Sequence, residues 1–428
     1  MKLKQIILRA ITLVICALGF SAHGDAAFTN LFSFSGTNGI TPEGELLQTS
    51  DGNLYGTARD TTLEKWGNGN FGFNGNGAVF KITTNGEFST LATFVRSKTN
   101  GAFPRAGLAL GEDGNLYGTT TGGGANRKGT VFKITTNGIL TILVSFDGTN
   151  GSDPSPGNRM VKDRDNSFYG TTFDGGLQDS RLANIPNIPH GWGTVFHVSA
   201  EGLLKTLVFF DMTNGARPNN GLIRGNDGNL YGTTSYGGLN NTNHLSPDEG
   251  GDGLGTVFKI SSDGSLSTLH VFKGVDGTGP SAIRQALDGT LYGITVNDGA
   301  TNTANPYEVY AWRPFTGAGT IFKISPTGKF TTLVLFYGAN GKNPDSFILG
   351  NDGNFYGTTE GGGANNLGTI FKLTLDGKFT TLYSFTEGSG SWPNLTSLIK
   401  GEDGNLYGTT TRRGKNQCGS IFRLVIKQ

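Results

Sequence analysis

The stretch Asp113-Gly114-Asn115-Leu116-Tyr117-Gly118-Thr119, followed by Gly129-Thr130-Val131-Phe132-Lys133, is one copy of a unit that recurs along the chain. The Tyr of the first motif recurs at positions 55, 117, 169, 231, 292, 356 and 407, and the Phe of the second at 80, 132, 196, 258, 322, 371 and 422. A later Phe and the Pro of a Gly-x-x-Pro loop also occur seven times each. A period of 51 to 64 residues suits a propeller blade and is too long for a solenoid coil.

Each unit contains four short segments rich in β-branched and aromatic residues, which predict four strands, A to D. In the second unit we expect them at 107–110, 116–120, 130–135 and 140–146. Asp113-Gly114 and Asn137-Gly138 are expected to close the A–B and C–D hairpins, because these dipeptides supply the positive φ that tight primed turns require. Val131, Phe132 and Ile134 place apolar residues on both faces of strand C, as a blade between two neighbours needs.

The two ends of the chain predict how the ring closes. The repeat begins with a lone D-type strand at 28–34 and ends after a C-type strand at 420–425. The first strand is therefore expected to complete the last blade, which also removes an exposed sheet edge. The predicted fold is all-β: a single seven-bladed β-propeller over residues 25–428, with four antiparallel strands per blade.

The composition excludes several classes of protein. Gly accounts for 70 of 428 residues, which disfavours long helices because Gly costs about 1 kcal/mol against Ala inside a helix. The 29 Phe and 12 Tyr are too many for a disordered chain. A net charge of +1 argues against a nucleic-acid partner or an anionic membrane surface.

The N-terminus has the features of a secretory signal. Lys2, Lys4 and Arg9 precede the apolar run 10–20, and small residues follow at 22–24, so residues 1–24 are predicted to be a signal peptide. The alternative is a membrane anchor, but a span needs about 20 apolar residues, so we expect none in the mature chain. The protein is therefore expected to be secreted, periplasmic or attached to the cell surface, and monomeric. The mature chain keeps one Cys, Cys418, expected to be a buried apolar side chain, with a reactive surface thiol as the alternative.

The units differ mainly in the loop between strands B and C. The spacing between the Gly residues of these strands is 11 residues in units 2, 6 and 7, and 21 to 26 in units 1, 3, 4 and 5. The B–C and D–A loops of a four-stranded meander emerge on the same face, so one face carries the irregular chain. Loops on a rigid scaffold commonly hold binding groups.

The insertions of blades 3 to 5 carry the candidate ligand-binding residues. Trp192 and Trp312 are predicted stacking platforms, since aromatic rings offer apolar area with few rotamers. The polar candidates include hydrogen-bonding groups at His190, His244, Asp248 and Arg313. The full predicted set is His190, Trp192, His244, Asp248, Glu249, Tyr307, Tyr310, Trp312 and Arg313. The alternative is that these loops fold over one another and the aromatic residues only pack them.

Other chemistry has little support in the sequence. No His-x-His or Cys-x-x-Cys spacing accompanies the histidines, so neither a metal site nor a cofactor is predicted. The Gly-Gly-Gly segments at 122–124 and 361–363 lack the Lys-Ser/Thr of a phosphate-binding loop. Catalytic residues are unknown; a lyase or hydrolase using His244 and Glu249 as acid and base stays open. The residues favour a non-catalytic binding or scaffold protein.

The repeat motifs resemble those of a known family. Asp113-Gly114-Asn115-Leu116-Tyr117-Gly118-Thr119-Thr120 and Gly129-Thr130-Val131-Phe132-Lys133-Ile134 look like the Gloeo/Verruco (GloVer) tandem repeat of exported bacterial proteins, and the match covers nearly all of the mature chain. The resemblance implies export and a repeat-built propeller, and no activity. A looser likeness is to virginiamycin B lyase, a seven-bladed propeller. The leading expectation is recognition of an extracellular glycan or protein by the B–C loops of blades 3 to 5. The alternative is a propeller lyase or hydrolase with its active site on the same face.

Overall fold

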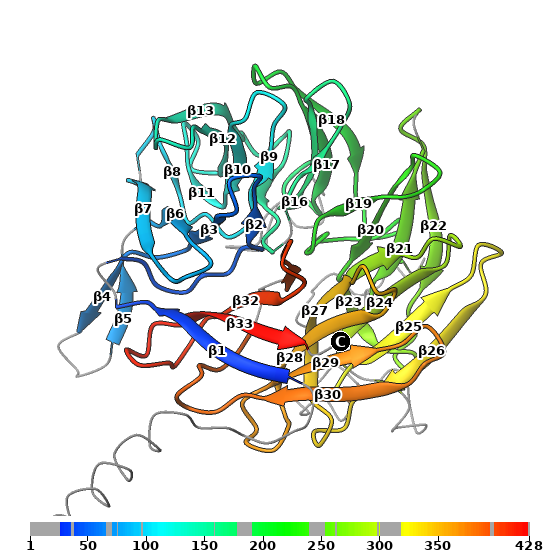
Figure 1. The fold of residues 1–428 in the computed structure, drawn as a ribbon. Coiled ribbons are helices and arrows are strands. Elements are labelled where there is room, and N and C mark those ends of the chain that lie inside the picture. The colour runs from blue at the N-terminus through cyan, green and yellow to red at the C-terminus, as the bar shows by residue number, and fades with distance from the viewer. Residues whose placement is uncertain are drawn as a thin grey trace, which may run out of the picture.

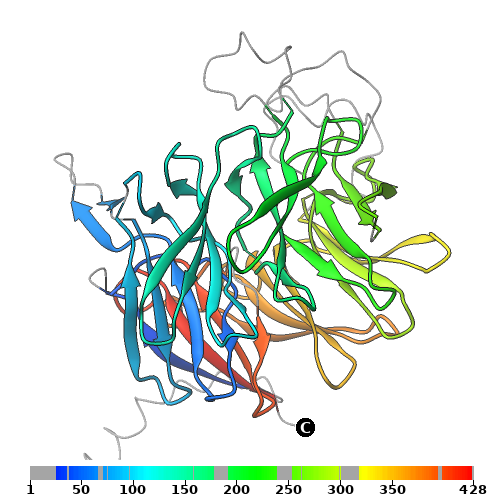
Figure 2. The same cartoon turned by 90° about the horizontal axis from the view of Figure 1, so that it is seen from above.

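Seven four-stranded antiparallel sheets form a closed ring around a central opening in the computed structural model (Figure 1). Figure 2 shows the ring turned by 90°, with the strands running between its two faces. The described part of the chain contains strands and turns and no helix. The structure describes residues 26–35, 38–65, 71–74, 76–95, 97–157, 159–177, 191–238, 253–261, 263–297, 299, 318–393 and 398–426.

The strands follow the predicted order A to D from the centre of the ring outwards. The first four blades consist of β2 (Leu47–Gln48), β3 (Leu54–Ala58), β6 (Ala78–Ile82) and β7 (Phe88–Thr93); β9 (Ala109–Leu110), β10 (Leu116–Thr120), β12 (Thr130–Ile134) and β13 (Leu140–Ser145); β15 (Val161–Lys162), β16 (Phe168–Asp174), β17 (Thr194–Val198) and β18 (Leu204–Phe209); and β19 (Leu222–Arg224), β20 (Leu230–Thr234), β21 (Thr256–Ile260) and β22 (Leu266–Val271).

The remaining blades complete the ring. They consist of β23 (Thr278–Gln285), β24 (Leu291–Asn297), β25 (Thr320–Ile324) and β26 (Phe330–Leu335); β27 (Lys342–Leu349), β28 (Phe355–Gly361), β29 (Thr369–Leu373) and β30 (Phe379–Ser384); and β31 (Ile399–Lys400), β32 (Leu406–Thr410), β33 (Ser420–Ile426) and β1 (Ala26–Ser33). Short extra strands lie in the connections, namely β4 (Thr62–Lys65), β5 (Phe71–Asn74), β8 (Gly101–Ala102), β11 (Gly122–Gly123) and β14 (Ser152–Pro154). The predicted fold class is confirmed.

The hairpin turns differ from the expected primed type. In the A–B hairpin of blade 2, Gly114 has φ +74°, whereas Glu112 and Asp113 have negative φ. The Gly114 amide donates to the carbonyl of Gly111, and the Gly111 amide to that of Asn115. This is the three-residue loop in which a left-handed Gly follows an ordinary turn, and a primed turn would need two positive φ values. The prediction of hairpins at these positions is correct, and the predicted turn type is wrong.

The repeated Tyr and Asp of the first motif bond to each other. The Tyr231 hydroxyl lies 2.7 Å from a carboxylate oxygen of Asp227, and the other oxygen of Asp227 accepts from the Asn229 amide. The same pair forms in four other blades. In blade 3, Tyr169 bonds instead to Asp163, two residues before the Asp165 of the motif, and in blade 5 no such bond is found between Tyr292 and Asp288. Burial, with the hydrogen bond to the acceptor carboxylate, raises the pKa of Tyr55 and Tyr407 to about 12. Where it forms, the bond ties the A–B turn to strand B.

The blades have no separate cores, because each apolar cluster lies between two neighbours. Blades 3 and 4, for example, share a cluster in which Val195 and Phe210 meet Leu230 and Phe258. Corresponding clusters join every other neighbouring pair, including blades 7 and 1. Each blade therefore buries its faces only when both neighbours are in place.

The N-terminal strand closes the ring as predicted. Strand β1 pairs with β33 from Ala26↔Ile426 to Ser33↔Ser420. Figure 1 shows this blue strand beside the red C-terminal strand. Cys418 lies in the cluster between blades 7 and 1 and is 1% exposed, so its prediction as a buried apolar side chain is confirmed. Burial raises the pKa of its thiol, which keeps the sulfur protonated.

Candidate functional site

Most of the predicted binding residues lie outside the described residues. These are His190, His244, Asp248, Glu249, Tyr307, Tyr310, Trp312 and Arg313. Trp192 is described, and its side chain is 2% exposed within the apolar cluster between blades 3 and 4. The structure therefore places Trp192 in the core, where its ring packs against neighbouring blades instead of facing solvent.

The face that carries the B–C loops has a repeated backbone feature that the sequence did not predict. The residue before each repeated Pro is left-handed in all seven blades, with φ between +52° and +61°. These residues are Thr41, Phe103, Asp153, Arg217, Gly279, Asn343 and Trp392. Their carbonyls can then reach the residue after strand B, as the 3.1 Å bond from the Ser235 amide to the Arg217 carbonyl shows. The same backbone conformation thus carries a different residue in each blade, and the residue is Gly279 in blade 5.

A cluster of charged and aromatic side chains lies where blades 3 and 4 meet on this face. Arg217 Nε lies 3.5 Å from the carboxylate of Asp174. The guanidinium also lies 5.3 Å from the ring centre of Phe173 and 5.8 Å from that of Tyr236. Tyr236 is 37% exposed. The cluster exposes the ring of Tyr236 to a molecule that contacts the surface, whereas Arg217 is partly exposed and its partner Asp174 is buried.

Two carboxyl groups have a raised pKa: Asp174, which belongs to this cluster, and Asp153, whose charge acts on Asp174. Burial raises the pKa of Asp153 to about 6, and the positive charge of Arg105 only partly offsets the effect. Burial also raises the pKa of Asp174 to about 6, opposed by Arg217 and reinforced by the negative charge of Asp153. Groups that titrate near neutral pH are suited to proton transfer, although buried ion-pair networks produce the same shifts.

We expect the Asp153→Asn variant to change how stability depends on pH. Because its pKa is raised, the carboxyl group of Asp153 keeps its proton in the folded protein at pH values where the unfolded chain has lost it. The contribution of Asp153 to the free energy of unfolding therefore falls as the pH rises from about 4 to about 7. Asn lacks the charge and tolerates the left-handed backbone. The variant should match the wild type near pH 4 and be more stable by about 1 to 2 kcal/mol at pH 7.5. Urea unfolding at both pH values measures this; a difference independent of pH would contradict it.

A second charged network joins blades 1 and 2. The buried carboxylate of Glu43 accepts from Arg59 Nη1 at 2.9 Å and from Arg105 Nε at 2.5 Å. Arg59 Nε also donates to Asp60 at 2.7 Å. Burial is the main cause of a raised pKa at Asp60, which the two arginines oppose. These partners satisfy one another, so the network is a structural clamp between the blades.

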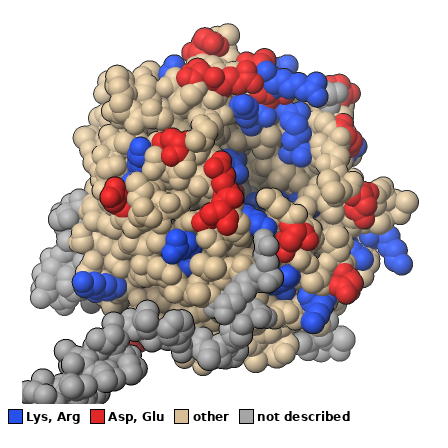
Figure 3. Space-filling model, in the orientation of Figure 1, with Lys and Arg blue, Asp and Glu red and all other residues tan. Residues whose placement is uncertain are grey.

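The central opening contains a cavity of about 640 Å³. Figure 3 shows it as a hollow in the middle of the ring, with charged side chains around it. Strand A of every blade contributes to the walls. The lining residues are Glu45, Leu47, Ala109, Leu110, Arg159, Met160, Val161, Lys162, Leu222, Ile223, Arg224, Arg284, Ile348, Leu349, Asn351, Leu398, Ile399 and Lys400. The volume lies within the range of small-molecule sites.

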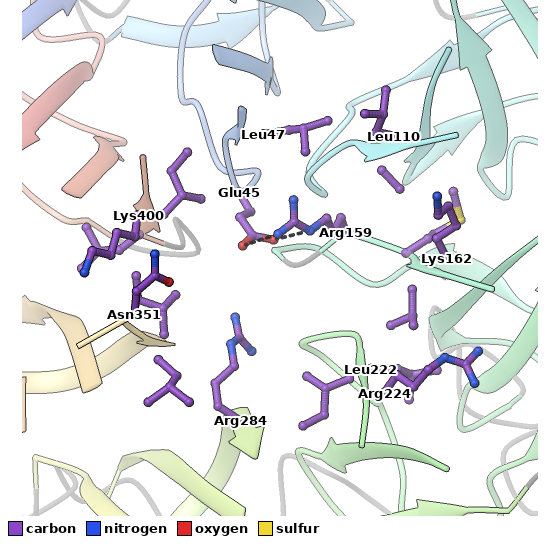
Figure 4. A pocket seen from close by; sticks show the side chains of 18 residues that line it. Glu45, Leu47, Leu110, Arg159, Lys162, Leu222, Arg224, Arg284, Asn351 and Lys400 are labelled. Carbon is purple, nitrogen blue, oxygen red and sulfur yellow. Dashed lines mark hydrogen bonds and ion pairs between the residues drawn. The ribbon is translucent and has the colours of Figure 1, made fainter. Parts of the chain in front are cut away.

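A loop of blade 3 enters the opening and brings Arg159 into it. The carbonyl of Gly157 accepts from the amides of Glu45 at 3.2 Å and Gly107 at 2.9 Å, which fixes the loop to blades 1 and 2. Arg159 Nε then lies 3.4 Å from the carboxylate of Glu45. Figure 4 shows this pair in the middle of the cavity, with Arg284 extending toward it from blade 5.

Sequence reasoning missed the cavity residues, although the repeats contained a signal. At the strand A position paired with the repeated Tyr, six blades have apolar residues and blade 5 has Arg284. Comparing the repeats with one another at this position would have revealed the exception. The sequence carries no signal for Glu45 and Arg159, because their proximity depends on the hydrogen bonds that the Gly157 carbonyl accepts from the amides of Glu45 and Gly107.

The ring of seven repeat-built blades, with variable loops on one face and a lined central cavity, defines a β-propeller repeat protein. The chain belongs to the Gloeobacter/Verrucomicrobia repeat family, whose model matches residues 19–183, 155–310 and 302–428. The resemblance inferred from the motifs is therefore confirmed. A search of curated protein sequences found no match.

Solved structures with a similar fold include extracellular domains of two hybrid two-component systems from B. thetaiotaomicron. Both are 11% identical to this chain with a TM-score of 0.53; the alignments cover 92% of this chain and 40% and 39% of those chains. This chain thus spans about two fifths of their length. A periplasmic gluconolactonase from Pseudomonas aeruginosa is 15% identical with a TM-score of 0.48, covering 83% of this chain and 96% of that one. Identities this low show the fold alone.

The described residues contain neither a membrane-spanning helix nor a metal-binding cluster. No helix there is long and apolar enough to cross a membrane. No group of three or more His, Cys, Asp or Glu in the same residues is arranged to hold a metal ion. The signal peptide at 1–24 stays a prediction, since those residues lie outside the described ones.

Proposed function

We propose that this protein is an exported, non-catalytic binding propeller that recognises an extracellular glycan or protein with the face carrying the long B–C loops of blades 3 to 5. The observation that supports the proposal is the cluster of Asp174, Arg217 and Tyr236 beside those loops. A half-exposed aromatic ring next to a cation and a carboxylate provides apolar contact and hydrogen bonds together. The rigid blades below it would hold these groups in place before a ligand arrives.

The proposal predicts binding that depends on Tyr236. Glycan and peptide arrays probed with the mature protein should identify a ligand class, and Tyr236→Ala should weaken binding roughly ten-fold, as expected for an interface aromatic residue. Leu203→Ala is the matched control, because Leu203 is 77% exposed and lies in a C–D turn on the opposite face. The control should bind like the wild type. Absence of binding, or equal binding by all three proteins, would remove the proposal.

An enzyme is the second candidate, and the raised pKa values of Asp153 and Asp174 favour it. One carboxyl could donate a proton and the other accept one, as a lyase or hydrolase requires. Turnover of a lactone or glycoside that Asp153→Asn and Asp174→Asn each abolish would support this candidate. Turnover that both variants retain would place catalysis elsewhere, and array binding without turnover would favour the binding protein.

A further inference from the structure

Arg284 occupies a position that is apolar in every other blade. Its partner across the A–B pair is Tyr292, and the equivalent residues beside the other six Tyr are Leu47, Ala109, Val161, Ile223, Ile348 and Ile399. All seven side chains line the central cavity. The repeat therefore builds an aliphatic ring around the opening and interrupts it once with a guanidinium.

The positive charge of the Arg284 guanidinium has no carboxylate close by among the described residues. Its Nη1 donates to the carbonyl of Ile283 at 2.8 Å, and among the described residues no carboxylate lies within 4.0 Å of it. The nearby carboxylate of Glu45 is already paired with Arg159. Burial is the main cause of a lowered pKa at Arg284; the charge of Arg159 adds to it and that of Glu45 opposes it. The group stays charged because an arginine in a protein does not lose its proton.

The other cations of the cavity each have a carboxylate within 4.0 Å. Lys162, Arg224 and Lys400 stand at the ends of their A strands, and each faces a turn of the preceding blade. They lie 3.7 Å from Glu112, 3.1 Å from Asp163 and 4.0 Å from Asp352, respectively. Asp352 is shared between Lys400 and Lys372. Among the described cations that line the cavity, Arg284 therefore differs in having no carboxylate within 4.0 Å.

We propose that the central cavity binds a small organic anion, a carboxylate with an aliphatic body, and that Arg284 holds the carboxylate. A guanidinium can donate two parallel hydrogen bonds to a carboxylate, and such bonds are strong where water is excluded. Leu47, Ile223, Ile348 and Ile399 would contact the aliphatic body. The described lining contains no aromatic ring on which a sugar could stack, so this ligand differs in class from a glycan. The site is also separate from the face proposed above.

Titration calorimetry with octanoate tests the proposal directly. The wild type should bind octanoate, and Arg284→Leu should bind it roughly ten- to a hundred-fold more weakly, because it loses a charge-assisted hydrogen-bonding pair. Arg164→Leu is the matched control: it removes the same charge from an exposed residue in an A–B turn outside the cavity. That control should bind like the wild type. Octanol, which lacks the charge, should bind weakly and equally to all three proteins.

Two results would overturn the inference. One is octanoate affinity that Arg284→Leu leaves unchanged. The other is inorganic phosphate binding as tightly as octanoate, which would show that the cavity recognises charge without an aliphatic body.

Thermal unfolding separates a binding role from a structural one. Leu at this position repeats what six blades already have, and it removes a cation without a close partner, so Arg284→Leu should fold with a melting temperature equal to or above that of the wild type. A large drop in melting temperature would show instead that Arg284 supports the ring.

Arg284→Lys is the second variant, since it keeps the charge and loses the two-point geometry. It should bind octanoate with an affinity between those of the wild type and Arg284→Leu, and wild-type affinity would contradict the two-point contact.

Discussion

A chain that lacks residues 26–34 is expected to lose cooperative folding and to aggregate. Strand β1 supplies the outer strand of blade 7, and the deleted segment contains three Phe, two in β1 and Phe34 directly after it, that pack against blades 6, 7 and 1. Phe28 stacks on Tyr383 at 4.3 Å and on Phe422 at 5.3 Å, and Phe32 stacks on Phe88 at 4.1 Å. Burial of three aromatic side chains contributes on the order of 10 kcal/mol, which is comparable with the whole stability of a typical domain. The deletion would also expose β33 as a free edge.

Moving the strand provides the control for this deletion. Phe28 pairs with Leu424 as Phe379 pairs with Leu373 in blade 6, so the two D strands have the same register. A chain in which residues 28–34 follow Leu424 through a copy of the turn at 374–378 should therefore refold into the closed ring. Circular dichroism melting and size-exclusion chromatography measure both variants. A deletion variant with an unchanged melting temperature and no aggregation would refute the closure.

Gly255→Ala is expected to be among the most destabilising single substitutions in the chain. Gly255 directly precedes strand C of blade 4 and has φ +101°, a conformation that Ala adopts only with strain. An added Cβ would also lie 2.3 Å from the carbonyl oxygen of Thr234 and 2.5 Å from Cδ of Pro280. Both contacts involve rigid groups, and the Pro belongs to the next blade. Strain and steric overlap together should cost more than about 4 kcal/mol.

Two other glycines separate strain from overlap. Gly228 has φ +81° with nothing within 4 Å of an added Cβ, so Gly228→Ala should cost about 1 to 2 kcal/mol from the backbone alone. Gly388 has neither a positive φ nor a close neighbour, and Gly388→Ala should be neutral or slightly stabilising. Guanidinium unfolding of the three variants should rank them in this order. Equal losses for Gly255→Ala and Gly228→Ala would show that the blades can separate to accept the extra carbon.

The repeat made the fold predictable because each repeated motif specifies one local structure, either a strand or a turn. Strand positions followed from repeated segments rich in β-branched and aromatic residues, and closure followed from counting strands at the two ends. The turn type was wrong because the dipeptide Asp113-Gly114 fixes where the positive φ falls and leaves open how many residues share the loop. Trp192 was expected at a surface because it adjoins an insertion, whereas the neighbouring blade covers it.

The sequence by itself determined the ring of seven blades, its closure by the first strand, and the face on which the loops differ, because these properties repeat at fixed spacing or concern the chain ends. Only the tertiary structure decided which side chains meet. Arg284 lies on strand A of blade 5, whereas Arg159 and Glu45 lie just before strand A of blades 3 and 1, and all three line the same central opening. Asp153 and Asp174 likewise acquire raised pKa values from burial by neighbouring chain. Local patterns cannot contain such information, since burial and charge proximity arise only once all blades surround the axis.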